Sequence, residues 1–212
     1  MAIHFENPKA TFIHIPKTAG SSFEQWVYTN IPDYARERKH AAVAEATDLF
    51  GDLGTTFTFV RNPYDRLVSQ FHFVGQRAQE RIEKRAQGRK VKKSTTQEWD
   101  IEISKLYNTG FDNWINLVYN KEESAYDLGN HLYKRGVPQT IWFDGKIDIV
   151  IKIENLKTDF KILQELFNCY IDLPVTNTSK RSHYRDYYTN KETRRMADAI
   201  VAPDLEKFGY EF

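Results

Sequence analysis

The sequence predicts an α/β fold that resembles a P-loop protein, with a central parallel sheet flanked by helices. Three apolar segments have the composition of strands: Phe12–Ile15, Thr55–Val60 and Ile147–Ile153. Each is followed by polar or small residues and then by a segment with helical spacing of apolar residues. Strands and helices that alternate in this way form parallel sheets, because each helix returns the chain to the edge where the next strand starts.

The first predicted strand leads into the loop TFIHIPKTAGSS, residues 11–22, and then into an amphipathic helix that starts near Phe23. The first N–H groups of a helix lack partners within the helix, and the helix dipole adds partial positive charge there. Gly20 allows the backbone to approach a ligand closely, and Lys17 adds a full positive charge. The loop therefore predicts a phosphate site, although an ordinary strand–turn–helix with an exposed lysine has the same local pattern.

The loop differs from the Walker A motif of ATP-binding proteins. That motif, G-x-x-x-x-G-K-[ST], places its lysine after the last glycine, whereas Lys17 precedes Gly20. A P-loop kinase or nucleotide triphosphatase is therefore the alternative function and not the first choice.

The second predicted strand, Thr55–Val60, ends in the cation Arg61, where a nucleotide triphosphatase often has a metal-binding acid. A cation at this place favours a bound anion. Pro63 and Asp65 suit the start of a helix that extends to about Ala86 and includes Ser69. Two anion sites at neighbouring strand ends would fit a molecule with two separate phosphate groups. An ion pair between Arg61 and Asp65 is the competing interpretation.

The remaining elements follow from apolar spacing and from capping residues. Helices are expected at 41–50, with Gly51 as the end, and at 98–107, 111–119, 158–170 and 190–202, and Pro203 is expected to start a short final helix. No repeat or linker interrupts the 212 residues, which predicts a single domain over 1–212.

Composition limits the choice of function. The net charge of +1 argues against a globally basic nucleic-acid binder, and the single cysteine, Cys169, excludes an internal disulfide framework. The chain contains no signal-peptide pattern and no run long enough for a membrane span, so a cytoplasmic location is expected.

Lysine and arginine dominate residues 76–93, with only Glu80 and Glu83 opposing them. This basic run is equally consistent with a solvated helix face and with a cradle for an anionic acceptor. A polyanion-binding module that uses residues 77–93 is therefore a further alternative function.

The two motifs together, HIPKTAGSS and FVRNPYDRLVSQF, resemble the carbohydrate sulfotransferases, which include the heparan-sulfate, chondroitin and dermatan enzymes. The resemblance extends more weakly through Pro138-Gln139, IKIENL, LPVTNTS and the C-terminal FGY. It implies a P-loop-like sulfotransferase fold and the donor 3′-phosphoadenosine 5′-phosphosulfate (PAPS).

The resemblance also implies roles for individual residues. Those of the first loop would hold the 5′-phosphosulfate: Lys17, Thr18, Ala19, Gly20, Ser21 and Ser22. Arg61 and Ser69 would hold the 3′-phosphate. A late segment with Thr178, Ser179 and Arg181 would close over the nucleotide.

Sulfuryl transfer to a hydroxyl requires a general base and positive groups at the leaving phosphate. We expect His40 to be the base, because its position resembles that of the family's catalytic histidine and because imidazole titrates near neutral pH. Lys17 would stabilise the leaving group, and this chemistry needs no metal. His131 is a reserve candidate for the base, whereas His14, His72 and His183 are weaker. The acceptor is expected to be a saccharide, and an anionic one is compatible with the basic run.

Overall fold

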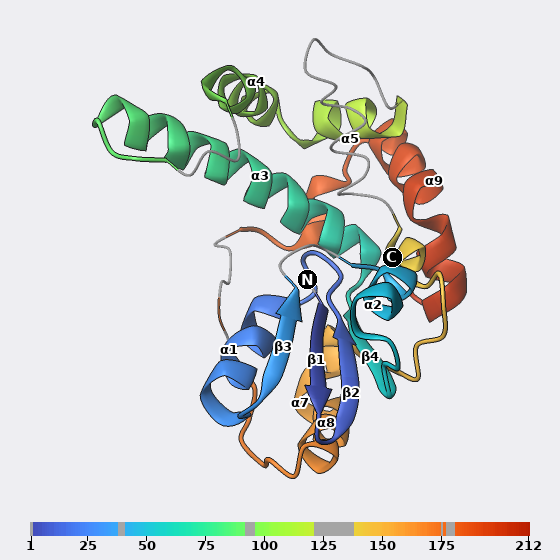
Figure 1. Cartoon of the computed structure of the whole chain (residues 1–212). Coiled ribbons are helices and arrows are strands. Elements are labelled where there is room, and N and C mark those ends of the chain that lie inside the picture. The colour runs from blue at the N-terminus through green and yellow to red at the C-terminus, as the bar shows by residue number, and fades with distance from the viewer. Residues whose placement is uncertain (1, 38–40, 92–95, 121–137, 175, 177–180) are drawn as a thin grey trace. The chain divides into compact units, whose positions relative to one another are not determined.

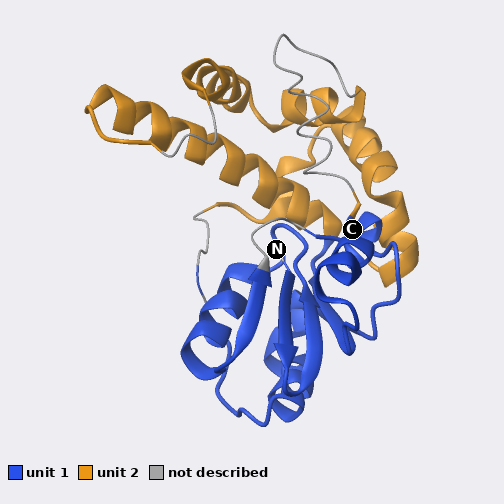
Figure 2. Cartoon of the chain, viewed as in Figure 1, with its two compact units in different colours: residues 1–62, 139–178 blue, residues 63–138, 179–212 orange. Residues whose placement is uncertain are grey.

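A computed structural model describes most of the chain. The described residues are 2–37, 41–91, 96–120, 138–174, 176 and 181–212. They form two compact units, each built from two separate stretches of sequence (Figure 2). Unit 1 contains residues 1–62 and 139–178, and unit 2 contains residues 63–138 and 179–212. No helix within the described part of the chain is long and apolar enough to cross a membrane.

Unit 1 is built on a five-stranded sheet with the order β3-β1-β2-β4-β5 (Figure 1). Its strands are β1 (Ala2–Glu6), β2 (Lys9–Ile13), β3 (Tyr34–Glu37), β4 (Thr55–Val60) and β5 (Ile149–Lys152). β2, β4 and β5 run parallel, whereas β1 is antiparallel to both β2 and β3. The prediction of a central parallel sheet flanked by helices is therefore confirmed, with β1 as the reversed strand.

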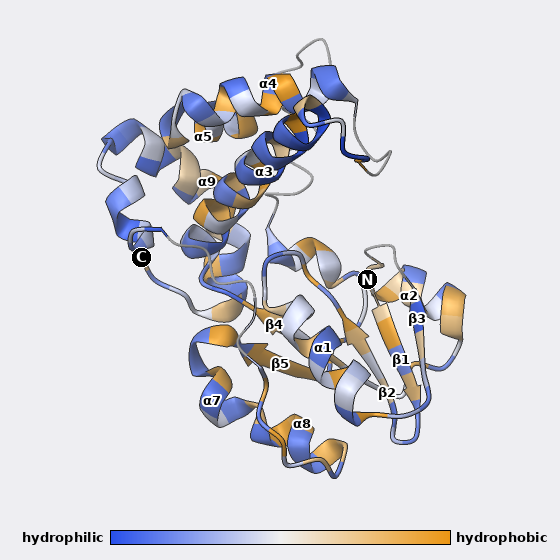
Figure 3. Ribbon diagram, turned by 90° about the vertical axis from the view of Figure 1, so that its left-hand side faces the viewer, coloured by the Kyte–Doolittle hydropathy of each residue, from blue (hydrophilic) through white to orange (hydrophobic). Residues whose placement is uncertain are grey.

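Aromatic side chains fill one face of this sheet. Alternate residues of β1, β2 and β4 point to that face, including Phe5, Phe12, Phe57 and Phe59, and all four are fully buried. The ring of Phe23 from α1 lies 4.5 Å from that of Phe12, centroid to centroid. Figure 3 shows β4 and β5 in hydrophobic colours. The packed face fixes the register of the sheet, because a slip by one residue would move every phenyl ring to the opposite face.

Helices cover the sheet of unit 1 and follow its strands. They are α1 (Gly20–Asn30), α2 (Val43–Phe50), α7 (Leu156–Asp159) and α8 (Lys161–Leu166), with short 3-10 turns η1 (Gln139–Trp142) and η2 (Ile153–Asn155). α2 ends at Gly51, which has a positive φ of 74° and whose N–H bonds the carbonyl of Thr47, so the predicted helix end is confirmed.

Unit 2 is helical. It contains α3 (Pro63–Ala86), α4 (Gln97–Asn108), α5 (Phe111–Asn120), the 3-10 turn η3 (Tyr184–Tyr187) and α9 (Lys191–Phe208). Apolar residues at helical spacing on α3, among them Tyr64, Leu67 and Phe71, face a core shared with α4, α5 and α9. Gly75 allows α4 to approach α3, since a Cβ there would lie 2.1 Å from the ring of Tyr107.

Most predicted elements are confirmed, but strand β1 was not predicted and four other elements differ. β4 matches its predicted range fully, but β2 starts at Lys9 and so precedes the predicted Phe12–Ile15. The polar segment from Tyr34 forms edge strand β3, because its backbone pairs with β1. Two short helices, α7 and α8, replace one predicted helix over 158–170. Pro203 lies inside α9 and does not restart it, because the buried side chains Ile200, Val201 and Asp204 hold both sides of the proline in one helix.

Candidate functional site

The loop after β2 has an unusual backbone. Lys17 and Ala19 have positive φ angles of 71° and 63°, and Thr18 between them does not. Residues with side chains rarely adopt positive φ, so the fold must hold the loop in this shape. A backbone that alternates in this way directs successive N–H groups to one side and forms a concave site for an anion. This backbone is compatible with the predicted phosphate loop.

Helix α1 begins directly from this loop at Gly20. Among the described residues, no side chain caps α1, and its first turn contains no acidic residue. The ring of His14 lies so close to Gly20 that a Cβ there would be 2.0 Å from it, so no larger residue fits. Thr18 is fully buried and donates from its hydroxyl to the carbonyl of Ile15 at 2.8 Å. These contacts hold the loop in shape and leave the start of α1 available to a ligand.

Ser22, in the first turn of α1, contacts a segment far away in the sequence. Its hydroxyl lies 2.8 Å from that of Thr176, and it accepts a hydrogen bond from the Thr176 N–H at 3.3 Å. The late polar loop of the sequence therefore meets the phosphate loop within unit 1. Thr176 belongs to the predicted segment LPVTNTS but had no predicted role, because its partner lies 154 residues away.

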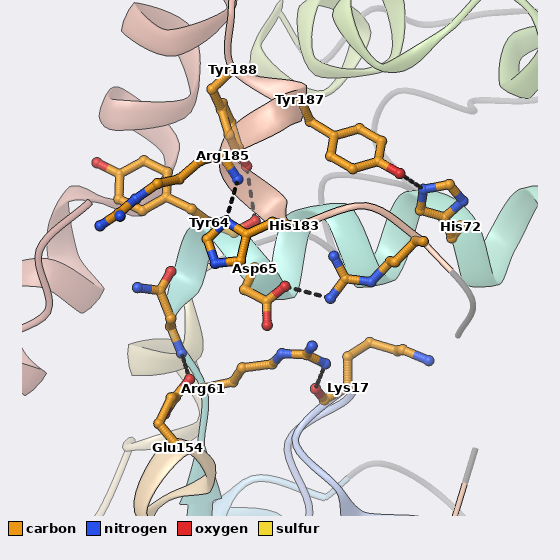
Figure 4. A network of polar contacts seen from close by, with 12 residues as sticks. Lys17, Arg61, Tyr64, Asp65, His72, Glu154, His183, Arg185, Tyr187 and Tyr188 are labelled. Carbon is orange, nitrogen blue, oxygen red and sulfur yellow. Dashed lines mark hydrogen bonds and ion pairs between the residues drawn. The ribbon is translucent and has the colours of Figure 1, made fainter. Parts of the chain in front are cut away.

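Arg61 follows β4, and its side chain extends to the same loop. Its Nη1 donates to the carbonyl of Lys17 at 3.3 Å (Figure 4). The side-chain amide of Gln139 fixes its backbone, because Gln139 accepts from the Arg61 N–H and donates to the Arg61 carbonyl, each at 2.9 Å. Gln139 is fully buried. The sequence prediction that the first two motifs meet at neighbouring strand ends is therefore realised, and Gln139 is a supporting residue that had no predicted role.

The end of β5 adds an acidic group near the same strand ends. Glu154 accepts a hydrogen bond from the N–H of Asn62 at 2.6 Å (Figure 4). This contact connects the residue after Arg61 to the turn that follows β5.

In unit 2, the start of α3 holds the other predicted residues. Asp65 and Ser69 are four residues apart and therefore lie on one face of the helix. Arg181 forms an ion pair with Asp65, and its side chain is only 8% exposed. Ser69 is buried, with 7% of its surface exposed. The structure therefore brings Arg181 to the helix face that carries Ser69, through its ion pair with Asp65.

His72 continues this face of α3. Its Nδ1 lies 2.9 Å from the hydroxyl of Tyr107. Its Nε2 lies 2.7 Å from the hydroxyl of Tyr187 (Figure 4). Burial lowers the pKa of His72, and the nearby charge of Arg181 lowers it further. The ring is therefore neutral at physiological pH, with one donor nitrogen and one acceptor nitrogen.

Two arginines of the basic run form ion pairs within unit 2. Arg81 and Arg85 both pair with Asp100 of α4, a carboxylate that is fully buried. α3 ends at Ala86, and Gly88 has a φ of 67°, so the predicted helix break at this glycine is confirmed. At least these two arginines neutralise a buried charge, which favours a structural role for that part of the run.

Some predicted residues lie outside the part of the chain that the structure describes. They are the proposed base His40, the reserve His131, and the late-segment residues Thr178 and Ser179. Among the described residues, no group of three or more His, Cys, Asp or Glu side chains could hold a metal ion.

A comparison with protein-family models gives one result. The model described as "Sulfotransferase family" matches residues 2–211, which include both compact units and every motif described above. No curated protein and no solved structure gives a significant match to the chain.

Proposed function

The chain belongs to the sulfotransferase family, and we propose that it transfers the sulfuryl group of PAPS to a hydroxyl of a carbohydrate. The observation that carries this proposal is the contact of Arg61 Nη1 with the carbonyl of Lys17. It brings a cation from the second strand end to a loop whose backbone is shaped for an anion.

The residues of the phosphate loop suit the 5′-phosphosulfate group. The uncapped start of α1 and the hydroxyls of Ser21 and Ser22 offer hydrogen-bond donors, and Lys17 adds positive charge. We assign Lys17, Thr18, Ala19, Gly20, Ser21 and Ser22 to this group. We assign Arg61 and Ser69 to the 3′-phosphate, and Thr178, Ser179 and Arg181 to the segment that closes over the nucleotide. Within unit 2, the location of Arg181 on the face of Ser69 supports part of this assignment.

The reaction forms a bond between the acceptor oxygen and sulfur and breaks the bond between sulfur and the 5′-phosphate oxygen. PAPS supplies the sulfuryl group and leaves as adenosine 3′,5′-bisphosphate. His40 would accept the proton of the acceptor hydroxyl, since imidazole side chains titrate near neutral pH and commonly act as general bases. Lys17 and the loop N–H groups would stabilise the charge that grows on the leaving phosphate. We further propose that residues 1–212 form a single sulfotransferase domain.

A thermal-stability experiment tests the choice of donor. A ligand that binds only the folded protein raises its stability by RT ln(1 + [L]/Kd). We expect adenosine 3′,5′-bisphosphate to stabilise the chain strongly. We expect ATP with magnesium, and heparin, to have smaller effects. Strong stabilisation by ATP–magnesium with none by the bisphosphate would instead favour the kinase or nucleotide triphosphatase alternative, and an effect of heparin alone would favour a polyanion-binding module.

A second experiment tests the base and the acceptor. Sulfate transfer from PAPS to a panel of neutral and anionic saccharides should be measured for the wild-type protein and for His40→Ala. We expect the variant to lose transfer and to keep its affinity for adenosine 3′,5′-bisphosphate. Turnover that survives in His40→Ala would show that another group accepts the proton, with His131 the next to test.

A further inference from the structure

One face of α3 carries three polar side chains in sequence. Asp65, Ser69 and His72 stand at positions i, i+4 and i+7, which lie above one another on a helix. Arg181 pairs with Asp65 at one end of this row, and its charge lowers the pKa of His72 at the other end. The ion pair therefore places the guanidinium at the end of the row, one helical turn from Ser69.

Arg181 can serve a carboxylate and a phosphate at once. A guanidinium presents five N–H donors in a fixed plane, and this geometry can bind two anionic groups at once. The ion pair with Asp65 also restricts the rotamers of a long side chain. A site built in this way requires the backbone of Arg181 to be held at a fixed distance from α3.

Two tyrosines attach the turn after Arg181 to α3. The hydroxyl of Tyr188 donates to the carbonyl of Tyr64 at 2.9 Å, near the start of α3. The hydroxyl of Tyr187 meets Nε2 of His72 two turns further along the helix. Tyr107 of α4 holds the opposite ring nitrogen, so the imidazole cannot rotate without breaking one of its two hydrogen bonds. η3 is therefore fixed at two points along α3.

We propose that His72 is a positioning residue of the donor site: through Tyr187 it fixes η3 on α3 and so holds Arg181 beside Ser69 for the 3′-phosphate. This inference rests on the proposed function, because it assumes that the donor is PAPS. It adds a role for His72 and Tyr187, neither of which contacts the reacting atoms.

Binding of two nucleotides to matched variants tests the proposal. Adenosine 3′,5′-bisphosphate carries the 3′-phosphate, and adenosine 5′-monophosphate lacks it. Tyr187→Phe removes only the hydroxyl that meets His72, and we expect it to weaken bisphosphate binding by roughly threefold to tenfold, the effect of one lost hydrogen bond. The affinity for the monophosphate should remain unchanged, because Arg181 has no 3′-phosphate to contact in that ligand.

Two substitutions of His72 test the hydrogen bonds of its two ring nitrogens one at a time. The amide of Gln reaches the place of Nε2, whereas that of Asn reaches only the place of Nδ1. We therefore expect His72→Gln to keep most of the bisphosphate affinity and His72→Asn to lose as much as Tyr187→Phe. Tyr184→Phe is the matched control, because it removes a hydroxyl from the same turn that forms no hydrogen bond among the described residues.

The outcomes distinguish this inference from the proposed function. A wild-type protein that does not bind the bisphosphate would overturn both. Wild-type binding with no change in folded Tyr187→Phe, or with equal losses for both nucleotides, would overturn the positioning role alone. Circular dichroism and thermal melting establish that each variant is folded, and if Tyr187→Phe is not folded, the Gln and Asn variants of His72 decide.

Discussion

The two units hold their site residues by different means. In unit 1, the main chain positions the predicted site residues. Parallel strands β2 and β4 end at one edge of the sheet, and the alternating φ angles of residues 17–19 shape the loop. In unit 2, side chains from separate helices hold one another, as in the pairs Asp65–Arg181 and His72–Tyr187. The predicted site in unit 1 therefore depends on local backbone geometry, and the predicted site residues of unit 2 depend on contacts between distant segments.

The largest expected effect tests the side-chain network of unit 2. The double variant Arg81→Ala/Arg85→Ala leaves the fully buried carboxylate of Asp100 without these two partners. Because breaking a buried ion pair is costly, we expect the free energy of unfolding to fall by about 3–5 kcal/mol. Urea unfolding measures this change.

The control for that variant comes from the same basic run. Arg77 is half-exposed and pairs with Glu80 across one helical turn. We expect Arg77→Ala to change the free energy of unfolding by less than about 0.5 kcal/mol. Equal small effects of both variants would show that the basic run is a solvated face throughout.

The second prediction tests the phosphate loop of unit 1. We expect Lys17→Ala to lower kcat for sulfate transfer by roughly 10²–10³-fold, because it removes a cation from the leaving phosphate. The thermal stability should change little, since the loop is held by its backbone and by Thr18. Lys9→Ala is the control: Lys9 begins the same strand β2 but pairs with Asp52, and its loss should leave kcat unchanged. A large loss of stability in Lys17→Ala would contradict the view that the backbone shapes the loop.

The same contrast explains how far the sequence predicts the structure. The strand–loop–helix units and the meeting of the Lys17 loop with Arg61 follow from apolar spacing, turn residues and the geometry of parallel strands. The partners of Asp65 and Ser22 do not follow, because Arg181 and Thr176 are more than 100 residues away and no local pattern indicates them. β3 was missed since its strand conformation depends on pairing with β1 rather than on its own composition.

The third prediction concerns Gln139, whose side chain forms hydrogen bonds with the main chain of Arg61 in unit 1. Gln139→Ala removes the partner of both the N–H and the carbonyl of Arg61. We expect the unfolding free energy to fall by about 2 kcal/mol, because two polar backbone groups lose their bonds. The affinity for adenosine 3′,5′-bisphosphate should fall as well, since Arg61 loses its fixed position.

Gln164→Ala is the control: Gln164 is also buried in unit 1, and its side chain donates a hydrogen bond to Asp172. If both variants lose stability and neither loses affinity, Gln139 supports the fold and not the site.

The smallest expected effect is a pH dependence in the sheet of unit 1. Asp148 accepts hydrogen bonds from Lys146 and from the N–H and hydroxyl of Thr56, which lower its pKa to about 2. Because this pKa lies below the ordinary value of about 3.9, the stabilisation is present above about pH 4 and is lost as the pH falls toward 2. We expect Asp148→Asn to lower the unfolding free energy at pH 7 by about 1 kcal/mol, a value reduced for the exposure of Lys146. The difference from the wild type should shrink between pH 4 and pH 2, as measured by urea unfolding.

Asp48→Asn, at an exposed position on α2, is the control. If the difference stayed constant down to pH 2, the Asp148 carboxylate would not be the titrating group, and strand pairing alone would hold β5 on β4.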